Sequence, residues 1–326
     1  MSNNRVIITG GAGYIGSHTC KHLHEKGYDI LIYDNLSTGH ADFLQWGDFI
    51  HGDILDTATL VEAINKFKPA GIIHFASFIN VGESTAHPGK YYKNNVCGSL
   101  SILEAMRLTG VNKLVASSSA AVYGNAETVP IDEASPIAPL NPYGTSKAMM
   151  EQLMADYTRS YGFNTAALRY FNAAGNDPEL KTGERHEPET HLIPKALLAL
   201  SGKEPCLKVF GNDYPTPDGT CVRDYIHVND LACAHRLAFE KLCSGTDKIN
   251  CNLGTGSGFS VLEIIEKIQK ITGKPVPCEV TGRRAGDPAT LVAKTGLAKT
   301  LLGWEACHSS LENIIATAWS WFKQEH

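Results

Sequence analysis

The segment from residue 5 to residue 34 constrains the fold of this chain more than any other part. Arg5-Val6-Ile7-Ile8-Thr9 is rich in β-forming residues, and the glycine turn Gly10-Gly11-Ala12-Gly13-Tyr14-Ile15-Gly16 follows it at once. A second apolar run, residues 28–33, ends in Asp34. A strand, a glycine turn, a helix, a second strand and an acid in this order predict a dinucleotide-binding βαβ unit.

The glycines and Asp34 each have a physical role in such a unit. Gly10 permits the tight turn, Gly13 lets the backbone approach a pyrophosphate, and Gly16 lets the helix lie close to the strand. The helix N-terminus then offers unpaired N–H groups to the phosphates. Asp34, 18 residues beyond Gly16, can accept both ribose hydroxyls and would repel a 2′-phosphate, which favours NAD over NADP.

Strand-like runs alternate with helical patterns as far as about residue 170. Further strands are expected at 48–52, 71–76, 113–118 and 164–169, with helices at 56–67 and 91–108 between them. This alternation predicts an α/β fold, a Rossmann-type doubly wound parallel sheet covered by helices on both faces. We expect residues 1–170 to form an NAD-binding domain.

The remaining sequence has a different character. Glycine- and proline-rich segments at 173–190, 211–220 and 281–290 separate helices expected near 191–201, 229–243 and 260–272. They predict a smaller C-terminal lobe that binds the substrate, residues 171–326, with some segments returning to the first domain. Ligands of a doubly wound sheet bind beyond the carboxyl ends of its strands, so this lobe would close over a substrate.

Tyr143 and Lys147 are the leading candidates for catalysis. Asn141 is a good helix N-cap and Pro142 suits the first helical position, so a helix is expected to begin here. Positions i and i+4 share one helix face, which sets the phenol beside the ammonium. A free tyrosine has a pKa of ~10, and a cation within ~4–6 Å can lower it by roughly 1–3 units. The pair also fits the start of an ordinary amphipathic helix, but beside a dinucleotide-binding unit it predicts acid–base chemistry.

Composition excludes several classes of partner. The 326 residues carry 29 Lys+Arg against 34 Asp+Glu, a net charge of −5 without a basic stripe, which argues against nucleic acid. No run approaches the ~18 apolar residues of a membrane span, and residues 1–9 lack the layout of a signal peptide. The nine cysteines are scattered and form no C-x-x-C pair, so we expect reduced thiols in a cytoplasmic protein without a membrane partner.

One polar cluster resembles a metal-binding motif. In His186-Glu187-Pro188-Glu189-Thr190-His191 the two histidines are five residues apart, and Pro188 disfavours a continuous helix. The segment therefore does not match the H-E-x-x-H arrangement. We interpret it as a polar substrate loop and predict no metal.

Several motifs resemble those of the extended short-chain dehydrogenase/reductase family. They are the glycine turn, Ser117-Ser118-Ser119-Ala120-Ala121-Val122-Tyr123-Gly124 and Tyr143-Gly144-Thr145-Ser146-Lys147. Three more narrow the resemblance to members that act on nucleotide sugars, and it then covers nearly the whole chain. These are Arg169-Tyr170-Phe171-Asn172-Ala173-Ala174-Gly175, Phe210-Gly211-Asn212-Asp213-Tyr214 with Arg223-Asp224-Tyr225-Ile226-His227-Val228, and Arg283-Arg284-Ala285-Gly286-Asp287.

The resemblance implies reversible exchange of UDP-glucose and UDP-galactose through a 4-keto sugar, with a tightly held NAD, in galactose metabolism. Tyr143 would remove the proton from the sugar O4, Ser119 would hydrogen-bond the same oxygen, and Lys147 would hold the nicotinamide ribose while lowering the pKa of the tyrosine. A homodimer through helices at 91–108 and 143–161 is also implied, by analogy alone.

The resemblance and the glycine motif together predict the binding residues. The cofactor-binding residues are Gly10, Gly13, Tyr14, Ile15, Gly16, Asp34, Asn35, Asp53, Ile54, Phe75, Ala76, Asn94, Tyr143, Lys147 and Phe171. The substrate-binding residues are Ser119, Tyr143, Asn172, His191, Leu192, Val209, Phe210, Arg223, Arg284, Asp287 and Leu291. Guanidinium groups suit a diphosphate because they are forked donors, although exposed loops also carry arginines. For Asn172 and Asp53 the alternative is a turn-capping role.

Departures from the family pattern leave alternatives open. Ile79 replaces a lysine of some members, and His191 replaces a common asparagine. Leu291 stands where a tyrosine would exclude N-acetyl sugars and a cysteine would admit them, so a 4-epimerase for UDP-N-acetylhexosamines or UDP-uronates stays an alternative. A 4,6-dehydratase needs an acid after Ser119, where this chain has Ala120 and Ala121. A non-enzymatic NAD sensor would not need Tyr143, Lys147 and Ser119 together.

Overall fold

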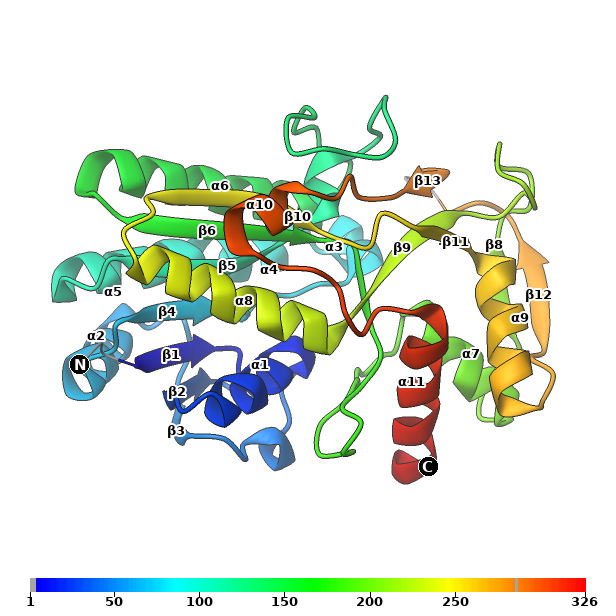
Figure 1. Ribbon diagram of the computed structural model, residues 1–326, viewed down its shortest axis with the longest axis horizontal. Helices are drawn as coiled ribbons and strands as arrows, with labels where there is room; N and C mark the ends of the chain where they lie inside the picture. The colour runs from blue at the N-terminus through cyan, green and yellow to red at the C-terminus, as the bar shows by residue number, and fades with distance from the viewer. Residues whose placement is uncertain (1–3, 285–286) are drawn as a thin grey trace.

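A seven-stranded sheet, parallel throughout, forms the centre of the molecule (Figure 1). The computed structural model describes residues 4–284 and 287–326. The strand order is β10-β6-β5-β4-β1-β2-β3. The bounds are β1 Arg5–Thr9, β2 Asp29–Asp34, β3 Asp48–His51, β4 Gly71–His74, β5 Lys113–Ser119, β6 Asn164–Tyr170 and β10 Lys248–Leu253. The order reverses between β1 and β4, where a doubly wound sheet leaves a crevice for its ligand. The predicted Rossmann-type fold is confirmed.

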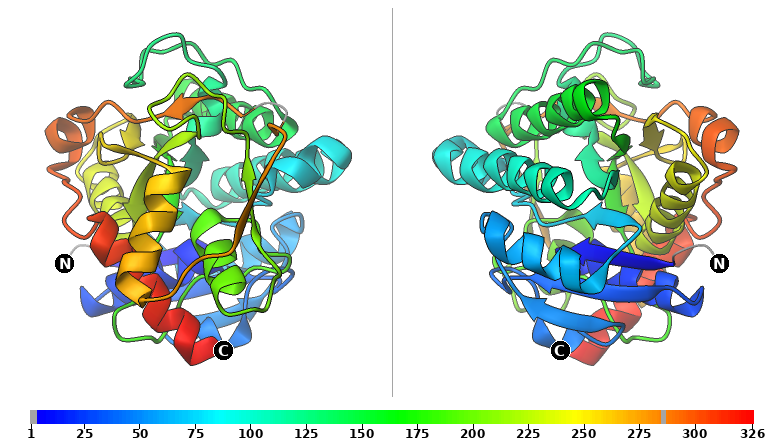
Figure 2. Two further views of the ribbon diagram at one scale, coloured as in Figure 1. Left: turned by 90° about the vertical axis from the view of Figure 1, so that its right-hand side faces the viewer. Right: turned by 90° about the vertical axis from the view of Figure 1, so that its left-hand side faces the viewer.

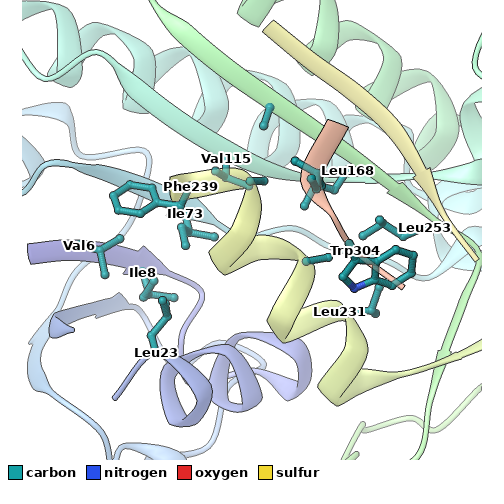
Figure 3. Close-up of a cluster of buried hydrophobic side chains, with 14 of the residues drawn as sticks. Val6, Ile8, Leu23, Ile73, Val115, Leu168, Leu231, Phe239, Leu253 and Trp304 are labelled. Carbon is teal, nitrogen blue, oxygen red and sulfur yellow. The ribbon is translucent and has the colours of Figure 1, made fainter. Parts of the chain in front are cut away.

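Helices cover both faces of this sheet, and each face has its own apolar core. One face carries α1 and α8, and the other carries α2, α5 and α6. Their bounds are α1 Tyr14–Glu25, α2 Thr57–Phe67, α5 Gly98–Thr109, α6 Pro142–Tyr161 and α8 Val228–Cys243. Val6 and Ile8 contribute to the first core and Ile7 to the second, since successive strand residues point to opposite faces. Figure 3 shows the first core, where Leu23 of α1 and Phe239 of α8 meet the sheet.

A second lobe lies beyond the carboxyl end of β1, whose arrow points toward it in Figure 1. It contains a four-stranded sheet, a parallel strand pair and three helices around a third apolar core. The sheet is built from β7 Asn172–Ala174, β9 Val222–His227, β11 Gly258–Ser260 and β13 Thr290–Leu291, and the pair from β8 Leu207–Phe210 and β12 Cys278–Thr281. The helices are α7 Leu192–Leu200, α9 Val261–Thr272 and α11 Leu311–Glu325. Figure 2 (left) views this lobe from its own side.

Short helical segments complete the fold. They are η1 Ala41–Phe43, α3 Val81–Ala86, α4 Pro88–Tyr91, η2 Tyr92–Cys97, η3 Ala120–Tyr123 and α10 Leu297–Leu302. The η2 segment is a π-helical turn between α4 and α5, so the single helix predicted over residues 91–108 contains a change of helix type. Such turns often occur at functional sites. In the described part of the chain, no helix is both long and apolar enough to cross a membrane.

The seventh strand is the main feature that the sequence pattern did not predict. The alternation continues past residue 170, because α8 packs on β5 and β6 and β10 pairs with β6. Asn250 and Asn252 interrupt the apolar run of β10, and Asn252 is buried because it accepts a hydrogen bond from the Tyr123 hydroxyl. The division of the chain into two domains at residue 170 stays a prediction. Two segments after residue 170, α8 and β10, pack with the seven-stranded sheet.

Candidate active site

A cavity of about 1060 Å³ opens where the loops after the sheet strands meet the second lobe. Gly10, Asp34 and Ser119 line it from the sheet side, and Arg223 and Arg284 line it from the lobe. Pockets for single small ligands span roughly 300–1,000 Å³. The volume of this cavity lies at the upper end of that range, so it can take a large ligand.

The glycine turn forms one end of this cavity. Gly10 has φ +76°, and a Cβ there would lie 2.5 Å from Ala76 N; a Cβ at Gly16 would lie 2.1 Å from Gly10 O. Side chains are excluded at both positions. Helix α1 begins after Gly13, an N-cap without a side-chain hydrogen bond. The first turn therefore keeps N–H groups for an anion, as predicted.

Asp34 ends β2 and lines the cavity beside the turn. Its carboxylate accepts hydrogen bonds from Ala12 N at 3.0 Å and Leu36 N at 2.8 Å. Burial raises the pKa of Asp34, and the two backbone donors oppose that shift. The bonds orient the carboxylate where a ribose would bind.

Asp53 lies behind the residues that line the cavity. It accepts a hydrogen bond from Asn35 at 3.1 Å and one from Leu55 N at 2.8 Å, and its neighbours Gly52 and Ile54 line the cavity. The structure thus shows Asp53 in the turn-capping arrangement that was the alternative to a direct adenine contact.

Helix α6 carries the predicted acid–base group. It begins as expected, with Pro142 in first position and Asn141 Oδ1 accepting a hydrogen bond from Gly144 N at 2.9 Å. Tyr143 lines the cavity, and its hydroxyl interacts with Ser119, the last residue of β5. Burial raises the pKa of Tyr143, and the bond with Ser119 opposes this.

Lys147 is buried one turn farther along α6. Its Nζ donates to Ser77 Oγ at 2.8 Å and to Ser117 O at 2.9 Å. Burial lowers the pKa of Lys147 to about 7, against an opposing effect of Glu151. The sequence predicted a lowered pKa for Tyr143, but in the structure the pKa of Tyr143 is raised, because desolvation outweighs the interaction with Ser119. A reactive phenol here needs additional positive charge.

A buried network of hydrogen bonds and one ion pair lies next to Lys147 along α6. Glu151 lies one turn beyond Lys147, and Arg169 Nε donates to its two oxygens at 2.9 and 3.2 Å. The Arg169 and Glu151 side chains are only 5% and 9% exposed. Arg169 Nη1 also donates to the Tyr123 hydroxyl at 2.8 Å, which donates to Asn252 Oδ1 at 2.7 Å. The network ties α6 to β6 and β10.

Two arginines and an aspartate form the lobe side of the cavity. Arg284 contacts both oxygens of Asp287, at 2.9 and 3.1 Å, and Arg223 approaches the same carboxylate at 3.8 Å. The Arg284 guanidinium also lies over the Phe210 ring, 5.4 Å from its centroid. Ala285 and Gly286 of the predicted motif lie outside the described residues. Asp287 holds the two cations together at the cavity wall.

The cavity brings together most of the residues predicted for it. Those that line it are Gly10, Gly13, Tyr14, Ile15, Gly16, Asp34, Asn35, Ile54, Phe75, Ala76, Asn94, Ser119, Tyr143, Phe171, Asn172, His191, Arg223, Arg284, Asp287 and Leu291. Asp53, Lys147, Leu192, Val209 and Phe210 are not among its lining residues. Leu192 lines a small neighbouring cavity, and Val209 is buried in the core of the second lobe. The binding roles of all these residues stay predictions.

Several functional neighbours were missed by the sequence reasoning. Ser77 lies just after the carboxyl end of β4 and accepts a hydrogen bond from Lys147. The predicted strand at 71–76 could have indicated Ser77, because ligands bind beyond the carboxyl ends of such strands. Tyr170 donates to the Ser117 hydroxyl behind Lys147. Asn95, on the π-helical turn, accepts from Phe78 N at 2.9 Å and donates to Ser146 at 3.0 Å. Nothing in the local sequence indicates that turn.

A polar loop between β7 and α7 also reaches the cavity. His186 and His191 line it, with Glu184 and Glu189 close behind. Burial lowers the pKa of His191, but Glu184 and Glu189 outweigh it and raise the pKa to about 10. Burial likewise raises the pKa of Glu189, and the two histidines outweigh it and hold the pKa well below its usual value.

The doubly wound sheet, the uncapped glycine turn, Asp34 and the Ser119–Tyr143–Lys147 group define a nucleotide-dependent enzyme of the short-chain dehydrogenase/reductase type. Residues 6–254 match the model of the NAD dependent epimerase/dehydratase family, and the chain belongs to that family.

Three relatives illustrate the match. The chain is 49% identical to a UDP-glucose 4-epimerase of Rhizobium leguminosarum bv. trifolii, covering 98% of both chains. It superposes with a TM-score of 0.96 on UDP-glucose 4-epimerase from Brucella ovis in complex with NAD, at 50% identity and 98% of each chain. The TM-score is 0.93 with UDP-glucose 4-epimerase from Bifidobacterium longum in complex with NAD+ and UDP, at 36% identity and 98% of each chain.

Proposed function

We propose that this protein catalyses the reversible 4-epimerisation of UDP-glucose and UDP-galactose with bound NAD, as a step of galactose metabolism. The observation that carries the proposal is the single cavity that joins the glycine turn and Asp34 to Arg223 and Arg284, with Tyr143 on its wall. A dinucleotide fits the first part and a nucleotide diphosphate fits the second. The reacting carbon would then lie beside the tyrosine.

The residues present fit NAD. The uncapped N-terminus of α1 suits a pyrophosphate, and a Cβ at Gly13 would meet only Gly10 O, at 3.4 Å, so the approach to this backbone is open. Asp34 presents a carboxylate to a ribose diol and disfavours a 2′-phosphate. When bound, oxidised NAD supplies a hydride acceptor and a positive charge.

The side chains of this protein control the proton and the position of the sugar. Tyr143, as phenolate, takes the O4 proton of the hexose while the C4 hydride leaves, which yields the 4-keto sugar. Ser119 hydrogen-bonds that oxygen and holds it toward Tyr143. The keto sugar would then rotate within the cavity, so that the hydride returns to the opposite face of C4 and Tyr143 returns its proton to O4. Lys147, fixed by Ser77 and Ser117, supports the phenolate through its charge.

The arginines account for the nucleotide diphosphate. Arg223 and Arg284 both line the cavity and are placed near each other by Asp287, and guanidinium groups are suited to bind a diphosphate. Anchoring the substrate through its diphosphate leaves the hexose free to rotate, which epimerisation requires. This separation of anchor and reacting ring supports the assignment.

We further propose a cytoplasmic homodimer. The exposed sides of α5 and α6 carry Leu100, Leu108, Met149 and Tyr161, which are 40%, 61%, 46% and 55% exposed. The two helices lie side by side on the outer surface of the sheet layer (Figure 2, right). The nine cysteines are unpaired in the described chain, which suits a reducing compartment. Light scattering of the wild type and of Met149→Glu tests the dimer: the substitution should yield monomers.

A substrate panel without added NAD tests the function. The purified enzyme should interconvert UDP-glucose and UDP-galactose, and acid extraction should release NAD close to one per chain. Protein that contains NAD but does not exchange the two hexoses would be a sensor and would overturn the proposal. Including UDP-GlcNAc, UDP-GalNAc and UDP-glucuronate in the panel separates the alternative epimerases.

A further inference from the structure

Four metal-ligating side chains meet in the loop between β7 and α7. Glu184, His186, Glu189 and His191 each offer one ligand atom, and these atoms all lie within 4.8 Å of one another. The closest approaches are His191 Nδ1 to Glu184 Oε1 at 2.8 Å and to Glu189 Oε1 at 3.3 Å, and His186 Nδ1 to Glu189 Oε2 at 3.5 Å and to Glu184 Oε1 at 3.6 Å. The segment is not helical, yet its folding converges the side chains on one point.

These spacings match a tetrahedral ion. Ligands at ~2.0–2.1 Å from zinc lie about 3.3 Å from one another in a tetrahedron. The four histidine–carboxylate separations, which involve both oxygens of Glu189, range from 2.8 to 3.6 Å, and the four candidate ligand atoms all lie within 4.8 Å of one another. Two imidazole nitrogens and two carboxylates form a donor set that zinc accepts.

The cluster is partly buried: the His186 and Glu189 side chains are 19% and 10% exposed, and the His191 side chain, at the cavity, is 43% exposed. The Glu184 side chain is only 3% exposed. Within the described residues, Glu184 Oε1, His186 Nδ1 and His191 Nδ1 are inaccessible to solvent, and their polar contacts are to one another and to Glu189. Unpaired buried polar atoms cost free energy, so a native structure normally satisfies them. An ion at the centre would satisfy all three.

The surroundings orient the ligands but do not neutralise them. Thr190 N and His191 N donate to Glu189 Oε1, at 2.6 and 2.8 Å, which leaves Oε2 for another partner. The two cations of the same loop are paired elsewhere, Arg185 with Asp42 and Glu325 and Lys181 with Glu179. The two carboxylates of the cluster are therefore balanced either by protonated histidines of the cluster or by a bound cation.

We propose that Glu184, His186, Glu189 and His191 bind one divalent transition-metal ion, with Zn²⁺ favoured. Four protein ligands leave no open position, so the site is structural and takes no part in the hydride transfer. It pins the loop against α1, where the His186 ring lies edge-on to Tyr14 with 6.0 Å between centroids. Because His191 would bind through Nδ1, its Nε2 stays available at the cavity. The proposal departs from the sequence analysis, which predicted a polar substrate loop and no metal because the segment does not match the helical H-E-x-x-H arrangement.

Metal analysis of the NAD-containing, full-length protein tests the proposal. After chelator treatment and dialysis, the protein is titrated with ZnCl2, and bound zinc is counted by mass spectrometry. We expect one tightly bound zinc per chain, with visible d–d bands of a tetrahedral site when Co²⁺ is used instead. Absence of stoichiometric binding would overturn the proposal and leave the cluster as ion pairs with protonated histidines.

Two variants and a matched control make the assignment specific. His186→Ala and Glu189→Gln should each weaken zinc binding by at least about tenfold, since changes even to outer-shell partners cost about 10–100-fold. Glu187→Gln changes an exposed carboxylate of the same loop and should bind zinc like the wild type. Unchanged affinity in both ligand variants would also overturn the site.

Stability measurements cover the case in which a variant folds poorly. Zinc should raise the melting temperature of the wild type and of Glu187→Gln, because it binds the native state, and should not raise that of the ligand variants. If adding zinc does not change the melting temperature of the wild type, that result would count against the site. These readouts are independent of epimerase activity, so failure of the metal site and failure of the proposed function are distinguishable.

Discussion

Lys147 donates a hydrogen bond from Nζ to the Ser77 hydroxyl over 2.8 Å, which ties α6 to the segment after β4. A second bond to Ser117 O, at 2.9 Å, ties it to β5. The ammonium is thereby held on the same helix face as Tyr143 but outside the cavity lining. The following predictions probe the proposed effect of this ammonium on the phenol, the phenol itself and the residues that support them.

Tyr143→Phe should retain NAD and lose epimerisation. The ring still fills its place, but the O4 proton has no acceptor, and loss of a general base typically costs about 10²–10⁴-fold in rate. Measuring kcat with UDP-galactose and the NAD content of the same preparation checks this. Near-normal turnover would contradict the role of Tyr143 as base, and an unchanged melting temperature would exclude misfolding as the cause.

Lys147→Met should move the rising limb of the pH–rate profile to higher pH. Burial already raises the pKa of Tyr143, and removing a nearby cation disfavours the phenolate further, so the phenol ionises only at higher pH. Profiles of kcat/KM from acid to alkaline pH measure the shift. Lys203→Met, which removes an exposed ammonium, serves as the control and should leave the profile in place. A profile of Lys147→Met identical to the wild type would refute the electrostatic role.

Arg169→Met should destabilise the protein more than the double variant with Glu151→Met. The single change leaves a carboxylate that is only 9% exposed without its cation, at a cost of about 3–5 kcal/mol, whereas the double change removes both charges. Urea denaturation followed by circular dichroism gives both values.

An exposed ion pair, Arg159 with Asp156, serves as the control for the buried pair of Arg169 and Glu151. Arg159→Met breaks the contact with Asp156, whose side chains are 75% and 42% exposed, and should change the free energy of unfolding little. A double variant that costs the sum of its single changes would show that Arg169 and Glu151 are not coupled.

Leu291 should set the size of sugar that the cavity accepts. Its side chain lines the cavity and packs with Phe171 against the cluster of Ala120, Val122 and Tyr123 that follows Ser119. Leu291→Tyr should lower kcat/KM for UDP-GlcNAc relative to UDP-glucose, and Leu291→Cys should raise it. Equal ratios in both variants would place the selection elsewhere.

The sequence predicted the features that local physics determines. The strand, glycine turn and Asp34 appear as expected, because tight turns and close backbone approach allow few other residues at Gly10 and Gly16. The start of α6 at Asn141 was likewise predicted, because capping depends on residues within one turn.

Features that depend on tertiary folding were not predicted. β10 joins the sheet through partners about 80 residues away, and its asparagines are polar because they bond to distant groups. The pKa of Tyr143 was predicted in the wrong direction, since helix spacing gives the neighbour of the phenol but not its burial. The close approach of His186 and His191 could not be predicted either, because the spacing of residues along a helix does not apply to this non-helical loop.

The position of β10 has a consequence for biosynthesis. β6 borders the growing sheet, yet the chain must be synthesised as far as Leu253 before that border is closed. Until then a nascent chain presents unsatisfied backbone groups along β6, and before Cys243 it also lacks the complete α8 over the apolar side chains of Val6, Ile8 and Val115. Fragments that end before Lys248 should therefore require chaperones or aggregate, although they contain the whole glycine turn and both Tyr143 and Lys147.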